Sequence, residues 1–226
     1  MSLAAEQHVT TECDPAPSSA PLFDLAEANR LFSNATPLDI IKRALDAADH
    51  PIISTSFSAH SPVLLHMAQI VRPGITVVWC DTGFNTPATY KFVDQLVKLL
   101  DLNLQVYQPL VSAAHLQARY NGIPEAGSAD HDDFTRIVKL EPFARAFDEL
   151  RPDLWITGIR REETAFRKTQ NIFTWDPSRA VTKVAPTFLS KTRDLAAYLE
   201  KHQLPSEYDY FDPTKPEEHL ECGLHF

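Results

Sequence analysis

The most reactive side chain in the amino-acid sequence stands close to its end. Cys222 lies in the segment ECGLH, residues 221–225, with His225 three positions after it. The thiolate is the nucleophilic form of a cysteine, and nearby cations favour it by lowering the thiol pKa. These residues alone leave three roles open for Cys222: a nucleophile, an unreactive thiol, or a disulfide partner of Cys13.

A cluster of basic residues could supply such cations. The segment GIRREETAFR, residues 158–167, and the residue after it contain Arg160, Arg161, Arg167 and Lys168. Guanidinium groups bind phosphate and sulfate oxygens in bidentate fashion, so the cluster favours an anion site. Alternatively, Glu162 and Glu163 neutralise it as a solvated, salt-bridged surface. Lys139 in KLEP and Lys183 in TKVAP add positive charge elsewhere.

A serine-rich loop is a second candidate for anion binding. The segment TSFSAHSP, residues 55–62, places the hydroxyls of Ser56, Ser58 and Ser61 just before a predicted helix. Backbone amides at a helix N-terminus attract anions, and hydroxyls can assist them. The alternative is a turn that only caps the helix. The segment lacks the glycines and lysine of a Walker loop.

A third polar loop has the sequence CDTGFN, residues 80–85. Two roles fit Asp81: it accepts hydrogen bonds from ribose hydroxyls or an exocyclic amine, or it caps a turn. Gly83 permits the tight turn itself. Cys80 directly follows an apolar run, and we interpret it as a small buried residue rather than a nucleophile.

These loops fall between alternating predicted strands and helices. Strands are predicted at residues 51–57, 75–79, 103–109, 154–158 and 182–189. Helices are predicted at residues 21–32, 37–49, 63–71, 87–100, 112–120, 135–150 and 191–203, with a loop at 121–133. The alternation predicts an α/β fold with a mainly parallel sheet and helices on both faces. Ligands of such sheets bind outside the carboxyl ends of the strands, where the three polar segments lie.

The composition excludes several classes of protein. Lys and Arg number 21 against 30 Asp and Glu in 226 residues, a formal net charge of −9, which argues against a general nucleic-acid binder. No apolar run approaches the roughly 18 residues of a membrane span, and no signal peptide is evident. Three cysteines are too few and too scattered for a disulfide framework or a zinc site. We therefore expect a cytoplasmic protein without a bound metal.

Four segments in fixed order resemble the phosphoadenylyl-sulfate (PAPS) reductases. They are TSFSAHSPVLLH, CDTGFNTPATYKFVDQL, GIRREETAFR and the terminal ECGLH, and LNLQVYQP, QARY and KLEPFARAF also align in order. The resemblance covers about residues 38–226. It implies an adenine nucleotide α-hydrolase-like (Rossmann-like) fold. It also implies an oxidoreductase of sulfate assimilation and cysteine biosynthesis that reduces PAPS to sulfite and adenosine 3′,5′-bisphosphate.

The resemblance also implies residue roles. Cys222 would attack the sulfonate sulfur, and thioredoxin or glutaredoxin would resolve the enzyme S-sulfonate. We infer that His225 orients or tunes the tail. The implied substrate-binding residues are Ser56, Phe57, Ser58, His60, Ser61, Asp81, Thr82, Gly83, Lys139, Gly158, Arg160, Arg161 and Arg167. A homodimer is implied as well.

We expect three parts in the chain. Residues 1–20 are predicted to form a flexible N-terminal arm, and residues 21–203 an α/β nucleotide-binding catalytic domain. Residues 204–226 are predicted to form a C-terminal tail that carries the nucleophile.

The sequence departs from the family pattern at points that bear on substrate and reductant. The cysteine pairs that hold an iron–sulfur cluster in the related adenylyl-sulfate reductases are missing, which favours PAPS and no bound cofactor. Many members have Gly-Asp-x-His-Thr-Thr before the nucleophile, where this chain has FDPTKPEEHL. The docking contacts of the tail therefore cannot be carried over from the family.

Three other functions remain as alternatives. Adenylyl-sulfate reduction is one. An ATP pyrophosphatase of the same PP-loop superfamily is another, but its usual Ser-Gly-Gly-x-Asp-Ser loop is replaced by SFSAHS. A non-catalytic nucleotide-binding protein is the third, and the intact ECGLH segment argues against it.

Overall fold

Both faces of the central sheet are buried, because neighbouring residues of its middle strands point into two different apolar clusters. In β1 (Pro51–Thr55), Ile53 packs with several helices on one face, and Ile52 packs with a helix on the other. Adjacent valines of β2 (Thr76–Cys80) divide in the same way. This burial is typical of parallel strands that are covered on both sides.

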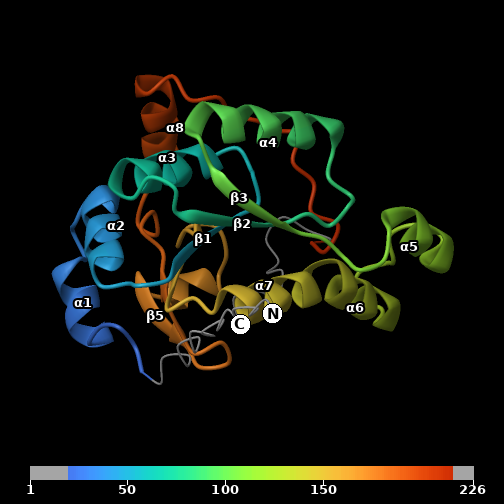
Figure 1. Cartoon of the computed structure of the whole chain (residues 1–226), viewed down its shortest axis with the longest axis horizontal. Coiled ribbons are helices and arrows are strands. Elements are labelled where there is room, and N and C mark those ends of the chain that lie inside the picture. Colours follow the sequence, from blue (N-terminus) through green and yellow to red (C-terminus); the bar gives the residue numbers. More distant parts are fainter. Residues whose placement is uncertain (1–19, 216–226) are drawn as a thin grey trace, which may run out of the picture.

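The computed structural model describes residues 20–215 and contains one six-stranded sheet in the order β3-β2-β1-β4-β6-β5 (Figure 1). The other strands are β3 (Asn103–Tyr107), β4 (Leu154–Ile156), β5 (Phe173–Asp176) and β6 (Val181–Val184). Neighbouring strands pair in parallel, except that β5 runs antiparallel to β6 at one edge. The predicted mainly parallel sheet is confirmed.

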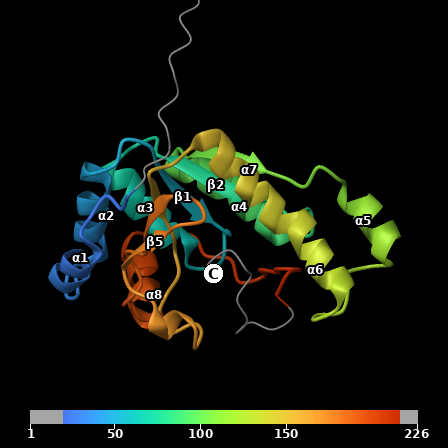
Figure 2. The same cartoon turned by 90° about the horizontal axis from the view of Figure 1, so that it is seen from below.

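Helices complete the layers on the two faces. The core on one face receives residues from α1 (Leu25–Leu31), α2 (Pro37–Asp46), α3 (Ser61–Val71), α4 (Pro87–Leu100) and α8 (Thr192–Lys201). The other face is covered by α7 (Glu141–Leu150), which continues directly from α6 (Ala129–Thr135) and the π-helix η1 (Arg136–Leu140). Helix α5 (Ala113–Tyr120) precedes α6 and is separated from it by a loop. A short 3₁₀ helix, η2 (Arg167–Thr169), precedes β5. In Figure 2, α5 and α6 lie at the end of the molecule opposite α1.

Threonine caps and prolines set where two of these helices begin. The hydroxyl oxygens of Thr36 and Thr86 each accept a hydrogen bond from the backbone amide three residues on. Pro37 and Pro87 follow as the first helical residues, where a missing N–H costs nothing. Helix α4 therefore covers residues 87–100 as predicted, which fixes the end of the polar loop before it.

Within residues 20–215, the sequence does not predict β5, α6 or the short 3₁₀ helix η2. Strand β5 is only four residues long and lies between the arginine-rich segment and β6. Helix α6 begins at Ala129, inside the stretch predicted as a loop up to residue 133. Ser128 caps this helix, and the negative charges of acidic residues in its first turn interact favourably with the positive end of the helix dipole.

The described part of the C-terminal segment packs against the domain. Residues 204–215 form neither helix nor strand, yet Asp212 and Thr214 are buried. Residues 1–19 and 216–226 lie outside the described residues, so the predicted three-part division stays a prediction. Within residues 20–215, none of the helices has the length and apolar character that crossing a membrane requires.

Conservative shortening of a β1 side chain tests how tightly the sheet is packed. Ile53→Val is expected to lower the free energy of unfolding by about 0.5–1.5 kcal/mol, because Ile53 is fully buried and the lost methyl group leaves a cavity. Denaturant unfolding measures the change. Ile70→Val is the matched control, since Ile70 is 52% exposed. Equal losses for both variants would contradict the assignment of Ile53 to the core.

Candidate active site

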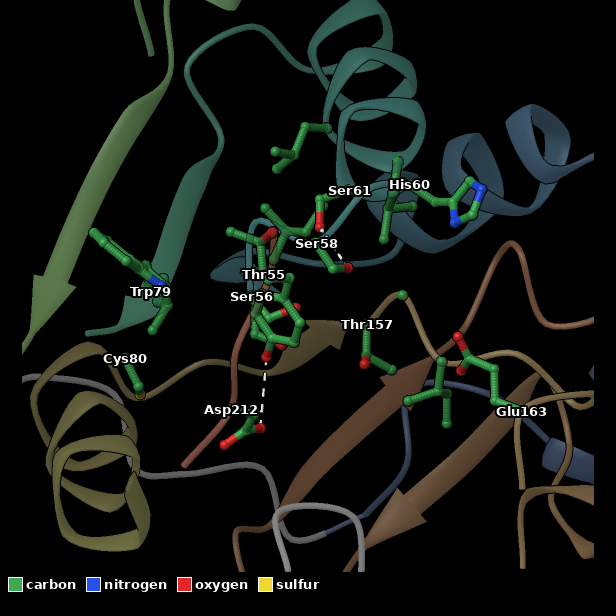
Figure 3. A pocket seen from close by; sticks show the side chains of 18 of the residues that line it. Thr55, Ser56, Ser58, His60, Ser61, Trp79, Cys80, Thr157, Glu163 and Asp212 are labelled. Carbon is green, nitrogen blue, oxygen red and sulfur yellow. Dashed lines mark hydrogen bonds between the residues drawn. The ribbon is translucent and has the colours of Figure 1, made fainter. Parts of the chain in front are cut away.

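The carboxyl ends of β1, β2 and β4 meet around a cavity of about 580 Å³ (Figure 3). A volume of this size is typical of pockets for small molecules. Residues that the sequence indicates for substrate binding line it: Ser56, Ser58, His60, Ser61, Thr82, Lys139, Gly158, Arg160 and Arg167. The parallel sheet brings most of them together, because its strand ends share one edge.

An aromatic contact supports the loop between β1 and α3. Phe57 is fully buried and has a left-handed backbone conformation, with φ 53°. Its ring packs edge-on against Trp79, with 5.3 Å between the ring centroids, and its amide donates to Thr55 Oγ1 at 3.1 Å. Phe57 is therefore not one of the residues that line the cavity. It supports the loop whose serines line it.

The same loop presents hydroxyls beside the N-terminus of α3. Ser58 Oγ lies 3.3 Å from Ser61 Oγ, and the Ser61 amide donates to the Ser58 carbonyl oxygen at 2.9 Å. Burial lowers the pKa of His60, and the charge of Arg160 lowers it further, so the neutral imidazole predominates at pH 7. Hydroxyls, a neutral ring and the positive end of a helix dipole suit this wall to an anion.

Asp81 organises the loop between β2 and α4. Its carboxylate accepts hydrogen bonds from the Gly83 amide (3.0 Å), Asn85 Nδ2 (2.8 Å), the Tyr90 hydroxyl (2.8 Å) and Gln108 Nε2 (2.8 Å). Asp81 is 3% exposed, so these four donors replace water. Gly83 takes the left-handed conformation that the turn requires, with φ 79°. The cavity wall from this loop consists of Cys80, Thr82 and Asn85, and Asp81 and Gly83 stand behind it.

Two buried arginines stand on the β4 side of the cavity, and glutamates hold both of them. Arg160 donates to Glu162 Oε1 at 2.6 Å, and its second terminal nitrogen lies 3.2 Å from Glu163 Oε1. Arg167 forms an ion pair with the other oxygen of Glu163. The arginine side chains are only 10% and 8% exposed, so water screens their charges weakly. The ion pairing proposed from the sequence is present, and it joins two buried arginines to two exposed glutamates, of which Glu163 lines the cavity.

A π-helical turn places Lys139 on another wall. In η1 the Glu141 amide donates to the Arg136 carbonyl oxygen five residues back. Pro142, which follows, has no N–H with which to continue an ordinary helical ladder. Single π turns of this kind often occur at functional sites, because the wide turn shifts the side chains after it around the helix axis.

The C-terminal segment supplies the partner of Lys139. Lys139 forms a buried ion pair with Asp212 and donates to Thr214 Oγ1 at 3.2 Å. Burial alone would raise the pKa of Asp212. The charge of Lys139 and the hydrogen bonds from Lys139 and Thr214 outweigh that effect and hold the pKa below its usual value. The segment thus contributes a wall of the cavity, made of Tyr210, Phe211, Asp212, Pro213 and Lys215.

Several residues singled out in the sequence lie elsewhere. Arg161 and Lys168 are exposed and are not among the lining residues. Lys183 is buried in β6, with its ammonium nitrogen 4.9 Å from the centroid of the Trp155 ring. Cys222 and His225 lie outside the described residues. Within residues 20–215, no group of three or more His, Cys, Asp or Glu side chains is placed to hold a metal ion.

Sequence reasoning misses other lining residues, among them Asn85, Thr157, Thr187 and Asp212. Thr157 and Thr187 follow β4 and β6, but the predicted strands at residues 154–158 and 182–189 extend over them, so the predicted strand ends do not indicate them. Asp212 offers no signal either, because it lies in a segment without periodicity.

Sequence comparisons connect this chain with a known family. A model of the phosphoadenosine phosphosulfate reductase domain matches residues 50–210. A phosphoadenosine 5′-phosphosulfate reductase from Xylella fastidiosa strain M23 is 37% identical over 190 residues, which cover 84% of this chain and 79% of the relative. A reductase of the same name from Xanthomonas campestris pv. campestris strain B100 is 41% identical over 153 residues, covering 68% of this chain and 63% of the relative.

Solved structures agree on the fold. The PAPS reductase of Candida auris, crystallised as a phosphate complex, superposes with a TM-score of 0.71 at 20% identity, covering 80% of this chain and 87% of that one. An NH₃-dependent NAD synthetase from Campylobacter jejuni has a TM-score of 0.50 at 12% identity and covers 80% of this chain and 75% of its own. The adenine nucleotide α-hydrolase-like fold implied by the sequence is confirmed.

Replacing Asp81 with asparagine tests its role in the loop. Burial, with the hydrogen bond and charge of Asp81, raises the pKa of Tyr90 to about 12. In Asp81→Asn we expect the pKa of Tyr90 to fall toward its usual value near 10, so tyrosinate absorbance should rise earlier in an alkaline titration. From about pH 10 to 12 the unfolded parent loses this proton before the folded parent does. Stability therefore declines with pH over that range, and less so in the variant.

The assignment to Tyr90 has its own control. In a Tyr90→Phe background, Asp81→Asn should leave the tyrosine titration unchanged, although Tyr107, whose pKa is also raised to about 12, is still present. A shift in that background would show that Asp81 acts on another tyrosine.

Proposed function

The chain belongs to the phosphoadenosine phosphosulfate reductase family, and on that premise we propose how its cavity carries out the reaction. The protein is an oxidoreductase that reduces PAPS to sulfite and adenosine 3′,5′-bisphosphate, a step of sulfate assimilation. The substrate residues, the nucleophile and the reductant are our proposals. The observation that carries them is the meeting of three buried cations, a helix N-terminus and the segment leading to Cys222 around one cavity.

In the proposed first step, the Cys222 thiolate attacks the sulfonate sulfur of PAPS. An S–S bond forms, and the bond between sulfur and the bridging oxygen breaks, so adenosine 3′,5′-bisphosphate leaves with the bond electrons. The enzyme is left as an S-sulfonate. Transfer from such an anhydride needs its negative charge neutralised and the nucleophile aligned with the sulfur.

The buried cations are the proposed binding groups for the phosphate and sulfonate oxygens. Arg160 and Arg167 face the cavity from the β4 side, and Lys139 faces it from η1. The hydroxyls of Ser58 and Ser61, at the N-terminus of α3, supply uncharged donors. Glu163 bonds to both arginines and holds their N–H groups in fixed directions, which reduces the ordering that substrate must impose.

The position of the C-terminal segment is compatible with Cys222 as nucleophile. Lys215 lines the cavity, and Cys222 follows it by seven residues. Seven extended residues span about 24 Å, so the thiol can reach the cavity from that point. His225, three residues further, is proposed to orient or tune the tail.

In the proposed second step, a dithiol protein reduces the S-sulfonate. One of its thiolates attacks the Cys222 sulfur and releases sulfite, and its second thiol then resolves the mixed disulfide and restores the Cys222 thiol. Thioredoxin or glutaredoxin fits this role.

We propose no bound cofactor, because three cysteines in the chain cannot supply the four thiolates of an iron–sulfur cluster. A cytoplasmic homodimer is the proposed setting.

Mass spectrometry of the reduced protein incubated with PAPS, without reductant, tests the nucleophile. One SO₃ group is expected on Cys222 and should disappear when thioredoxin is added. Cys222→Ser should form no adduct. Cys80→Ser is the matched control, because Cys80 also lines the cavity, and it should be sulfonated like the parent. An adduct on Cys80 would contradict the proposal. Parallel incubation with adenylyl sulfate identifies the preferred donor.

Nucleotide binding tests the proposed cation set. Arg160→Ala is expected to weaken binding of adenosine 3′,5′-bisphosphate about 10- to 100-fold, because charge-assisted hydrogen bonds are lost, and to leave adenosine binding nearly unchanged. Titration calorimetry measures both. Arg161→Ala removes an equal charge from an exposed position outside the cavity lining and should have little effect. Equal loss for both ligands in Arg160→Ala would contradict an anion-binding role.

A further inference from the structure

We infer that Asp212 is a positioning residue: its ion pair with Lys139 fixes residues 206–215 along the cavity wall and so sets the point from which Cys222 is delivered to the sulfonate. The inference rests on the proposed nucleophilic role of Cys222. It adds a residue that sits in FDPTKPEEHL, the part of the chain that lacks the docking motif of many relatives.

The C-terminal segment follows the rim of the site and touches three different elements. Ser206 Oγ donates to the Ala59 carbonyl oxygen at 2.8 Å, in the loop before α3. The Asp209 carbonyl oxygen accepts hydrogen bonds from the hydroxyls of Thr86 (2.7 Å) and Thr89 (3.1 Å) at the start of α4. These contacts use backbone carbonyls, so they hold the chain without depending on a particular side chain at position 209.

The third contact is of a different kind, because it buries two opposite charges. The side chains of Lys139 and Asp212 are 10% and 5% exposed. Removing either charge from such a pair leaves the other buried without its partner, which is strongly unfavourable. The segment therefore cannot leave the cavity wall at Asp212 without exposing or stranding a charge, a cost that its other described contacts do not carry.

Asp212 also sets the direction of the chain beyond it. Its Oδ1 accepts hydrogen bonds from the Thr214 amide at 3.1 Å and the Thr214 hydroxyl at 2.7 Å, and the Lys215 amide donates to its carbonyl oxygen at 3.1 Å. Figure 3 shows Asp212 among the side chains that line the cavity. The turn at residues 212–215 therefore starts the chain toward Cys222 from a fixed place inside the cavity.

Changing Asp212 should lower the rate of S-sulfonation without weakening the binding of the nucleotide. Asp212→Asn keeps the shape of the side chain but removes a negative charge that faces an anion site, so nucleotide affinity should not weaken. The same change loosens the attachment of the tail, so the nucleophile is aligned less often. Misplacement of a reacting group by about 1 Å can cost a factor of about 100 in rate. A general structural defect would instead weaken affinity and rate together.

The test compares S-sulfonation under single-turnover conditions with binding of adenosine 3′,5′-bisphosphate. With saturating PAPS and no reductant, Asp212→Asn should form the Cys222 adduct about tenfold or more slowly than the parent, with a dissociation constant no weaker than the parent's. Asp209→Asn is the matched control, because it removes the same charge from an exposed side chain three residues earlier. It should match the parent in both measurements.

Thr214→Val provides a second variant if Asp212→Asn fails to unfold cooperatively. It removes one hydrogen bond to Lys139 and one to Asp212 but keeps the ion pair, so a smaller decrease in rate is expected, again without loss of affinity. Rates within twofold of the parent for the folded variants would overturn the inference, as would parallel loss of rate and affinity. A parent that forms no adduct would overturn the proposed function itself, and the inference with it.

Discussion

The buried ion pair between Lys139 and Asp212 joins the two parts of the site that chemistry requires to meet. Two opposite charges withdrawn from water offset each other, and removing either one leaves the other buried at a substantial cost in free energy. The sheet edge supplies the proposed substrate-binding groups, and the C-terminal segment carries the proposed nucleophile. The ion pair therefore links the position of the C-terminal segment to that of the sheet edge. Lys139, its basic partner, lies within the π turn of η1.

The same arrangement recurs on the opposite wall, where Glu163 bonds to Arg160 and Arg167. A chain with a formal net charge of −9 thus concentrates buried cations in one cavity and holds each of them with a carboxylate. Cations fixed in this way are already oriented when a polyanion such as PAPS binds, and little reorganisation remains for the reaction step.

The sequence predicts those parts of the site that depend on strand ends. The loops after residues 55, 80 and 156 converge because a parallel sheet aligns the carboxyl ends of its strands. The resemblance of their motifs to one family can be recognised from the sequence alone. Side-chain direction is not predictable in this way. Arg160 and Arg161 are adjacent and chemically alike, yet one is buried in the cavity and the other is exposed, because the turn after β4 points them apart. Asp212 is unpredictable for another reason: its partner Lys139 is 73 residues away, and no periodic pattern connects them.

The most direct measurement is a crystal structure of the Cys222→Ser variant with bound PAPS. We expect the phosphosulfate to contact Arg160, Arg167 and Lys139 beside the N-terminus of α3, with Asp212 still paired to Lys139 and residue 222 facing the sulfonate sulfur. A C-terminal segment whose Asp212 has left Lys139 while residue 222 still faces the sulfonate, or a nucleotide bound away from the carboxyl ends of β1, β2 and β4, would contradict this arrangement.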